Sequence, residues 1–271
     1  MKYADIQNLS DAKFKRLTGV PHPIFKQMVA ILEKTMPTFG RPPKLSRADQ
    51  LLLTLMYWRE YRTQFHIGQA YGISESAVCR TIQQVENTLV ESGQFTLPGK
   101  KKLQASDTLI EVVIVDATEQ PIERPKKQKR HFSGKRKCHT QKAQVIVNLT
   151  TLEIVTTAFS EGKKHDFKLF KESGQGMIQT ITCLADSGYQ GIVKIHKNSQ
   201  TPQKKSKHHP LTKEEKAVNR ALAKARIYGE HVIGKLKIFR ILKERYRNRR
   251  KRFGLRFNLI ASIYNLSLGI K

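Results

Sequence analysis

Three acidic residues, Asp116, Asp186 and Glu230, are placed as candidates for a metal site. Asp116 lies near the end of the apolar run EVVIVDAT, and Asp186 directly follows the apolar run ITCLA. In sheets with parallel neighbours, functional groups gather beyond the carboxyl ends of strands. If these two strands are adjacent, the carboxylates converge and need a cation between them. Taken alone, either aspartate is better explained as the cap of a turn.

Glu230 is the third carboxylate, and it lies in a strongly basic stretch. From Lys216 to Arg252 there are fourteen Lys or Arg residues and two acids. Arg226, Glu230 and Lys237 fall on one face of a helix. The residues Ile227, Val232, Ile233 and Leu236 give this helix an apolar surface, so it should pack on the protein. A surface ion-pair ladder is the alternative, and a carboxylate on a docked helix could instead complete a site for Mg²⁺ or Mn²⁺.

The overall charge of the chain points to a polyanionic partner. The 271 residues carry a formal net charge of +28, and 39% are hydrophobic, which is enough for a core in one large or two small domains. Lys and Arg bind phosphate backbones with release of condensed counterions. An anionic membrane surface and a ribosomal or RNA-packaging role are the competing explanations.

Targeting and cysteine signals are weak in this sequence. No apolar run approaches the ~20 residues of a membrane span, and MKYADIQNLS lacks the apolar core of a signal peptide. Cys79, Cys138 and Cys183 form no CxxC pair, so neither a zinc knuckle nor a disulfide framework is indicated. A reducing, cytoplasmic setting is expected, without a membrane partner.

Residues 1–95 are predicted to form a helical domain with a helix-turn-helix over about 63–90. Gly72 and Ile73 suit the sharp turn, and Ser74 can cap the second helix. That helix would present its first residues to DNA; the predicted contacts are Ser74, Glu75, Ser76 and Arg80. An ordinary helical hairpin is the alternative.

The pattern changes after a predicted linker at 96–107. Runs rich in β-branched residues predict strands at 111–118, 143–149, 153–159 and 181–185, with a further candidate at 192–196. Helices are expected from Asp166 and from Thr212, and a loop from Ser199 to Leu211. This order indicates an α/β domain over 108–271 with a basic C-terminal helical tail.

The chain resembles DDE transposases of the insertion-sequence-five type, which are related to the Harbinger elements. The motifs occur in the family's order: GRPPKLSRADQLLLTLMYWREYRTQFHIGQAYGISES, VVIVDATEQPIERP, HFSGKRKCHTQKAQVIV and ADSGYQG. The family's Tyr-x2-Arg-x3-Glu-x6-Lys signature is matched by Arg226, Glu230 and Lys237, while Ala223 replaces the tyrosine. His165 and Asp166 match a His-Asp pair of this family, and Asp166 could equally cap a helix.

This resemblance implies an RNase H-like catalytic domain, a mixed sheet flanked by helices, in which the first and fourth strands are neighbours. Asp116, Asp186 and Glu230 would then be the catalytic residues and would bind two Mg²⁺ ions, for which Mn²⁺ can substitute. The expected protein is a transposase of a bacterial insertion sequence. It would bind terminal inverted repeats, cleave and transfer DNA strands, act as a homodimer or higher oligomer on DNA, and reside in the nucleoid.

The basic loop between the first two strands is expected to grip DNA. From Arg124 to Lys142 it contains nine Lys or Arg residues and no acids. A solvated hairpin face is the alternative. The predicted DNA contacts are Lys126, Lys127, Arg130, Lys135, Arg136 and Lys137, together with Arg226 and Lys237. The basic tail ERYRNRRKRFGLRF is expected to contact DNA or to cover an acidic surface of a partner subunit.

Other functions remain open at the level of sequence. A DNA-binding regulator or domesticated protein could use the same scaffold without cleavage, but it would gain nothing from carboxylates clustered against DNA. An RNA-binding basic protein does not explain the strand-end aspartates. A stand-alone Mg²⁺-dependent nuclease has less need of a sequence-reading helical domain.

Overall fold

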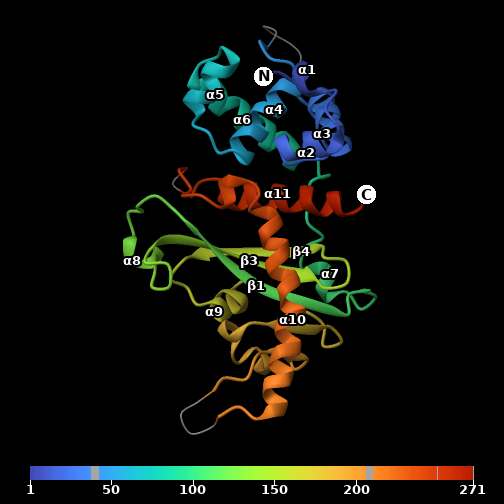
Figure 1. Ribbon diagram of the computed structural model, residues 1–271, viewed down its shortest axis with the longest axis vertical. Coiled ribbons are helices and arrows are strands. Elements are labelled where there is room, and N and C mark those ends of the chain that lie inside the picture. The colour runs from blue at the N-terminus through green and yellow to red at the C-terminus, as the bar shows by residue number, and fades with distance from the viewer. Residues whose placement is uncertain (38–42, 206–209, 249, 271) are drawn as a thin grey trace. The chain divides into compact units, whose positions relative to one another are not determined.

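The computed structural model describes residues 1–37, 43–205, 210–248 and 250–270. The chain divides into two compact units, drawn in Figure 1. The helical unit comprises Met1–Thr96, Leu236–Glu244 and Leu255–Lys271, and the α/β unit comprises Leu97–Lys235 and Arg245–Gly254. This division differs from the expected one at the C-terminus, because the last helix groups with the N-terminal helices rather than with the sheet.

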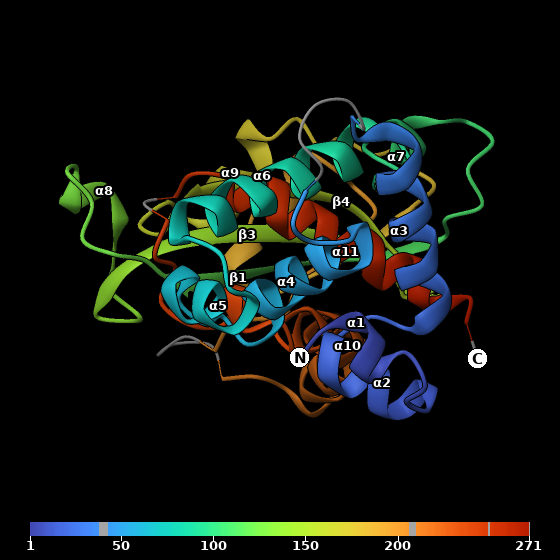
Figure 2. The same ribbon diagram turned by 90° about the horizontal axis from the view of Figure 1, so that it is seen from above.

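The helical unit is built from amphipathic and apolar helices around buried leucines and aromatic residues. Trp58, Leu52 and Leu55 are at most 1% exposed, as the apolar run between 51 and 58 predicts. Figure 2 shows these helices from above. Their bounds are α1 (Tyr3–Ile6), α2 (Asp11–Thr18), α3 (His22–Thr35), α4 (Arg47–Arg59), α5 (Gln64–Tyr71), α6 (Glu75–Glu91), η3 (Arg240–Leu242) and α11 (Phe253–Leu268).

A buried ion pair joins the C-terminal helix to the rest of the helical unit. Arg256 Nε of α11 lies 2.6 Å from Glu86 Oε1 of α6, and both side chains are at most 3% exposed. The indole N–H of Trp58 donates to the same carboxylate oxygen at 3.1 Å. The Arg256 guanidinium also lies over the Tyr57 ring, 5.3 Å from its centroid. The partners of Glu86 therefore come from both ends of the chain.

The α/β unit contains a mixed sheet with helices packed on it. The strands are β1 (Val112–Pro121), β2 (Phe132–Ser133), β3 (Cys138–Asn148), β4 (Ile154–Glu161), β5 (Thr182–Ala185) and β6 (Ser199–Gln200). The helical segments are α7 (Lys101–Gln104), α8 (Gln128–His131), α9 (Asp166–Glu172), η1 (Ser187–Tyr189), η2 (Ile192–Lys194) and α10 (Lys213–Leu236).

The sheet has six strands in the order β2-β3-β1-β5-β6, and β4 pairs with β3. The pairs β1–β3 and β3–β4 are antiparallel, whereas β1–β5 and β5–β6 are parallel. The first long strand and the strand that precedes Asp186 are therefore neighbours, as the resemblance to RNase H-like domains implies. The predicted fold class is confirmed: a helix-turn-helix region precedes a mixed α/β sheet.

Alternation along β1 gives the sheet two buried faces. Val113 and Val115 belong to the larger apolar cluster, which also contains Phe170 of α9. Ile114 belongs to a second cluster with Leu184 of β5 and Leu222 of α10. Because successive side chains point to opposite faces of a strand, α9 and α10 cover opposite sides of β1.

Two local predictions were wrong. The segment 192–196 contains the 3₁₀ helix η2 instead of a strand. The predicted loop after Ser199 begins with the short strand β6, which pairs with β5. The apolar run at 192–196 is too short to distinguish a strand from a helical turn. Ser199 and Gln200 are polar and give no apolar pattern that would predict a strand.

Candidate active site

Asp116 and Asp186 follow matching positions of two adjacent parallel strands. Val115 of β1 and Ala185 of β5 are register partners, and each is followed by one of the aspartates. Two residues earlier, Ile114 and Leu184 both lie in the cluster with α10. The backbone at Asp186 is still extended, so alternation directs both carboxylates to the side of the sheet that α10 covers.

Glu230 reaches the same side of the sheet because α10 lies very close to β1. A Cβ added to Gly229 would lie 2.8 Å from Ile114 Cγ2, so only glycine allows this approach. Ile114 is two residues from Asp116, and Gly229 immediately precedes Glu230. Figure 1 shows α10 crossing β1 and β3. Val232 and Ile233 are buried as predicted, but Ile227 is 45% exposed and does not contribute to the packed face.

Electrostatic coupling shows that the three acids share one environment. The pKa of Asp116 is raised from 3.8 to about 6, first by burial and further by the charges of Asp186 and Glu230. The backbone N–H of Ala117 and the charge of Arg226 act in the opposite direction. The protein therefore places three mutually repelling carboxylates together. Arg226 is the cation that partly offsets their effect on the pKa of Asp116.

Each aspartate accepts a hydrogen bond from a nearby backbone N–H, Asp116 within β1 and Asp186 at the start of η1. The N–H of Ala117 donates to Asp116 Oδ1 at 2.8 Å, and the N–H of Gly188 donates to Asp186 Oδ1 at 2.7 Å. The turn-cap explanation is thus correct for one oxygen of Asp186. In the described part of the chain, the second oxygen of each carboxylate has no hydrogen-bond donor, so it is available to a cation.

The donor set suits a hard divalent cation, since it consists of carboxylate oxygens. Within the described ranges, however, no three His, Cys, Asp or Glu side chains are close enough to form a metal-binding group as they stand. The Nε atom of Arg226 is buried and lacks a hydrogen-bond acceptor among the described residues. The pKa of Asp116 is raised first by burial, and a bound cation would offset the smaller repulsion from Asp186 and Glu230.

Lys142 and Asp166 form an ion pair next to this site that the sequence did not predict. Lys142 Nζ lies 2.6 Å from Asp166 Oδ1 and 3.7 Å from Glu119 Oε1. A Cβ at Gly188 would lie 2.9 Å from Asp186 Oδ1 and 3.0 Å from Asp166 Oδ2. Asp166 therefore adjoins Asp186, and it is the first residue of α9, whose N-cap position is occupied by His165. The predicted helix cap is instead an ion-pair residue.

A buried chain of polar side chains supports the turn after Asp186. The hydroxyl of Tyr189 donates to Gln144 at 3.1 Å, and Gln144 donates to Gln175. Gln175 in turn donates to Thr156 Oγ1 at 3.2 Å. The pKa of Tyr189 is raised well above 10, first by burial and then by nearby carboxylates. The helix η1 begins directly after Asp186. This network fixes the position of η1 relative to β3 and β4.

The helix-turn-helix has the local geometry that its sequence predicts. Gly72 adopts φ = 65°, and Ser74 Oγ accepts a hydrogen bond from the N–H of Ala77 at the start of α6. A Cβ at Gly68 would lie 2.7 Å from the carbonyl oxygen of Ile73, so the turn is tightly packed. The predicted DNA contacts on α6 are exposed: Ser74, Glu75, Ser76 and Arg80.

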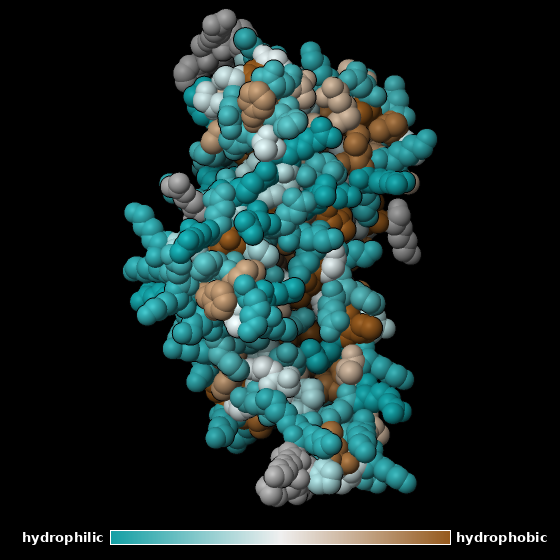
Figure 3. All heavy atoms as spheres, turned by 60° about the vertical axis from the view of Figure 1, so that its left-hand side comes forward, coloured by the Kyte–Doolittle hydropathy of each residue, from teal (hydrophilic) through white to brown (hydrophobic). Residues whose placement is uncertain are grey.

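The predicted DNA contacts of the basic loop are exposed as well. The loop between β1 and β3 carries α8 and extends beyond the sheet (Figures 1 and 2). The residues Lys126, Lys127, Arg130, Lys135, Arg136 and Lys137 are all exposed. Figure 3 shows one face of the molecule, most of which is covered by hydrophilic side chains.

The two remaining candidates belong to different units of the chain. Arg226 lies on α10 within the electrostatic environment of Asp116. Lys237 follows the last residue of α10 and belongs to the helical unit. The sequence spacing placed both residues on one helical face, but the helix ends at Leu236, before Lys237.

Two family models match this chain. The model of the DDE superfamily endonuclease matches residues 115–265, more than half of the chain, and this range contains all three candidate acids. The chain belongs to the DDE superfamily of endonucleases. The model of the helix-turn-helix of the same superfamily matches residues 43–95, so the DDE endonuclease has a helix-turn-helix region typical of DNA-binding proteins.

Curated relatives place the DDE endonuclease among transposases. It is 50% identical, over the full length of both chains, to a probable transposase for insertion sequence element IS702 from Microchaete diplosiphon. It is 29% identical to a putative transposase for insertion sequence element IS112 from Streptomyces albus G, with 84% of this chain and 83% of that protein aligned. No solved structure matches the chain. None of its described helices is long and apolar enough to cross a membrane.

Proposed function

We propose that this DDE endonuclease is the transposase of a bacterial insertion sequence of the insertion-sequence-five type. It binds the terminal inverted repeats of its element, cleaves the DNA at the ends, and joins the freed 3′-hydroxyl groups to target DNA. The observation that carries this proposal is the convergence of Asp116, Asp186 and Glu230 on the face of β1 that α10 covers. A protein that only binds DNA has no use for three carboxylates on a basic surface.

Asp116, Asp186 and Glu230 are the proposed ligands of two Mg²⁺ ions. When bound, such ions activate the attacking oxygen and stabilise the leaving oxygen of an in-line displacement at phosphorus. The carboxylates hold their positions because β1 and β5 are paired and because α10 is packed against Ile114. Asp116 must be ionised to take part, and the charge of Arg226 favours that state.

Arg226 has a second proposed role at the scissile phosphate. Its Nε atom is buried and lacks an acceptor among the described residues. A guanidinium donates to phosphate oxygens in a fixed geometry, which suits it to orient the strand that is cut. Lys237, which lies beyond α10, is a proposed contact to a more distant phosphate.

DNA recognition is proposed to divide between the two units. The exposed start of α6 reads the terminal repeat, and the basic loop between β1 and β3 contacts phosphates. Two element ends must be brought together before strand transfer. We therefore propose that the protein acts on DNA as a homodimer or a higher oligomer.

Cleavage of DNA tests this proposal. Labelled duplexes that carry the inverted repeats flanking the gene should be nicked in Mg²⁺ or Mn²⁺ and not in EDTA. The variants Asp116→Asn, Asp186→Asn and Glu230→Gln should each lose at least about 100-fold of the cleavage rate while they retain affinity for the duplex. The matched control is Asp107→Asn, since Asp107 is exposed and lies on neither β1 nor β5.

Two outcomes would contradict the proposal. Wild-type protein that binds the repeats without cutting them would indicate a DNA-binding regulator. Full activity in all three carboxylate variants would show that the catalytic site lies elsewhere.

A further inference from the structure

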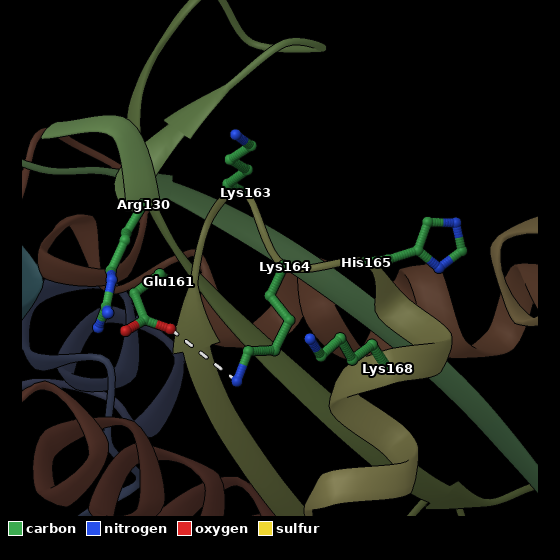
Figure 4. A pocket seen from close by; sticks show the side chains of 6 residues that line it. All are labelled: Arg130, Glu161, Lys163, Lys164, His165 and Lys168. Carbon is green, nitrogen blue, oxygen red and sulfur yellow. Dashed lines mark ion pairs between the residues drawn. The ribbon is translucent and has the colours of Figure 1, made fainter.

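A basic pocket lies beside α9, and none of the residues that line it is a proposed metal ligand. It has a volume of about 430 Å³, and Figure 4 shows its side chains, which come from α8, the end of β4, the segment leading into α9 and α9 itself. The lining residues are Arg130, Glu161, Lys163, Lys164, His165 and Lys168. Basic side chains thus outnumber the single acid, and the pocket suits an anion.

Part of this positive charge is not neutralised by the protein. Lys164 lies 2.6 Å from Glu172 and 4.0 Å from Glu161, and Lys168 lies 3.7 Å from Glu172. Lys163 is exposed, and its ammonium group has no carboxylate partner in the part of the chain that the structure describes. The lysine therefore remains available to a phosphate group.

A second pocket adjoins the first and shares Lys163 with it. Its volume is about 420 Å³, and its lining consists of Gln128, Lys129, Phe132, His139 and Lys163. Phe132 of β2 is 44% exposed, and its register partner on the neighbouring strand β3 is His139. Their ring centroids are 5.9 Å apart at an interplanar angle of 78°. An exposed aromatic ring beside lysines offers a face on which a base can stack next to cations that bind its phosphate.

The basic pocket is connected to Asp186 through Asp166. His165 lines the pocket, and the next residue, Asp166, adjoins Asp186 at Gly188. Lys142 links these segments, since it donates to the carbonyl of Lys164 at 2.7 Å and pairs with Asp166. Arg130, Lys163 and Lys168 are therefore candidates for contacts to the phosphates that neighbour one bound at Asp186.

We propose that the two pockets together bind an unpaired nucleotide of the DNA end, with its phosphate at Lys163 and its base stacked on Phe132. This inference rests on the proposed function and specifies which state of the DNA the site recognises. A paired base offers no free face to a side chain, whereas an unpaired base can stack on an aromatic ring. Stacking tolerates any base, so this site would add affinity without sequence preference.

The test compares the affinity of the full chain for two DNA ends in EDTA. One is a blunt duplex, and the other is the same duplex with a short single-stranded overhang. Fluorescence anisotropy gives the ratio of their dissociation constants. Wild-type protein should prefer the overhang, and Phe132→Ala should reduce that preference by about 10-fold, in line with stacking of one base.

Two further variants separate stacking from charge. Phe132→Trp should retain the preference because it keeps an aromatic face. Lys163→Ala should weaken binding of the overhang and reduce its salt slope by about one. Ile195→Ala is the control, since Ile195 is an apolar side chain that is 48% exposed and lines neither pocket. It should leave the ratio unchanged.

The outcomes distinguish this inference from the proposed function. Equal affinity of wild-type protein for both ends, or an equal loss for both ends in Phe132→Ala, would overturn the nucleotide site while duplex binding still supported the proposed function. Failure to bind either DNA would overturn both. Competition by a polyglutamate peptide as strong as by a single-stranded oligonucleotide would also overturn the inference, because it would show a general anion site.

Discussion

Asp116 and Asp186 follow register partners of two parallel strands, so their carboxylates lie side by side at one edge of the paired region. Hydrogen bonds between the strands fix the backbone positions of these two residues. Glu230 is held differently. It depends on the close approach of α10 to β1 at Gly229, which makes the helix contact the sensitive part of the site.

Replacement of Gly229 by alanine should inactivate the enzyme without unfolding it. The added Cβ would lie 2.8 Å from Ile114 Cγ2, so α10 must shift away from β1 and carry Glu230 with it. A displacement of this kind typically costs about 100-fold in rate. DNA cleavage and circular dichroism measure the two effects separately.

Gly234→Ala on the same helix is the control for this prediction. A Cβ at Gly234 would meet no atom within 4 Å, so the change should retain activity and stabilise the protein by about 0.5–1 kcal/mol. Equal effects of the two substitutions would show that helix packing does not position Glu230.

The metal-free protein should be destabilised above about pH 6 by the charge on Asp116. The folded-state pKa is about 6, raised from 3.8, so the folded state holds this proton more tightly than the unfolded state. Stability then decreases as pH rises between about 4 and 6. Asp116→Asn removes this effect and should raise the free energy of unfolding by about 1–3 kcal/mol at pH 8.

Urea denaturation in EDTA at pH 4 and pH 8 measures this difference. At pH 4 the folded state is protonated at Asp116 and the unfolded state is about half protonated, so the advantage of the variant should be well below its value at pH 8. A variant that was less stable than wild-type protein at pH 8 would contradict the raised pKa.

The Lys142–Asp166 pair should make a measurable contribution to stability. Lys142→Met leaves the Asp166 carboxylate next to Asp186 without its cation and should destabilise the fold by about 3 kcal/mol. Combining it with Asp166→Asn should recover part of the loss. A double-mutant cycle measured by urea denaturation gives the coupling energy, and additive effects would show that the pair is not coupled.

The C-terminal helix should be required for the stability of the helical unit. Glu86→Ala leaves the buried guanidinium of Arg256 without its carboxylate and should cost about 3–5 kcal/mol. The double substitution Glu86→Leu with Arg256→Met, which replaces both charges by apolar groups, should restore most of this loss. Thermal unfolding of the full chain measures both. A neutral effect of Glu86→Ala would contradict the buried pair.

The sequence was most informative where local chemistry determines the structure. The β-branched run before Asp116 predicted β1, and Gly72 and Ser74 predicted the turn and the start of α6, because a glycine in a left-handed conformation and a capping hydroxyl act within a few residues. Resemblance to a family supplied the pairing of the first and fourth strands, which periodicity alone does not give.

Contacts between distant segments were not predictable from the sequence. From the sequence, Glu86 looks like an exposed residue of the second helix of the helix-turn-helix. In the structure it is buried in an ion pair with Arg256, which is distant in the sequence. Nothing in the sequence around Lys142 indicates a buried ion pair. That pair exists only because the fold places Asp166 and Glu119 beside the lysine. Gly229 gave no signal either, since the need for a small residue arises only where α10 meets Ile114.

The central claim is that Asp116, Asp186 and Glu230 together hold divalent metal ions at the DNA end. Binding of Mn²⁺ to the protein–DNA complex, measured by electron paramagnetic resonance, tests it most directly. Wild-type complex should bind two ions per active site. The triple variant Asp116→Asn, Asp186→Asn, Glu230→Gln should bind neither, although it still binds DNA. Unchanged Mn²⁺ binding in that variant would contradict the account.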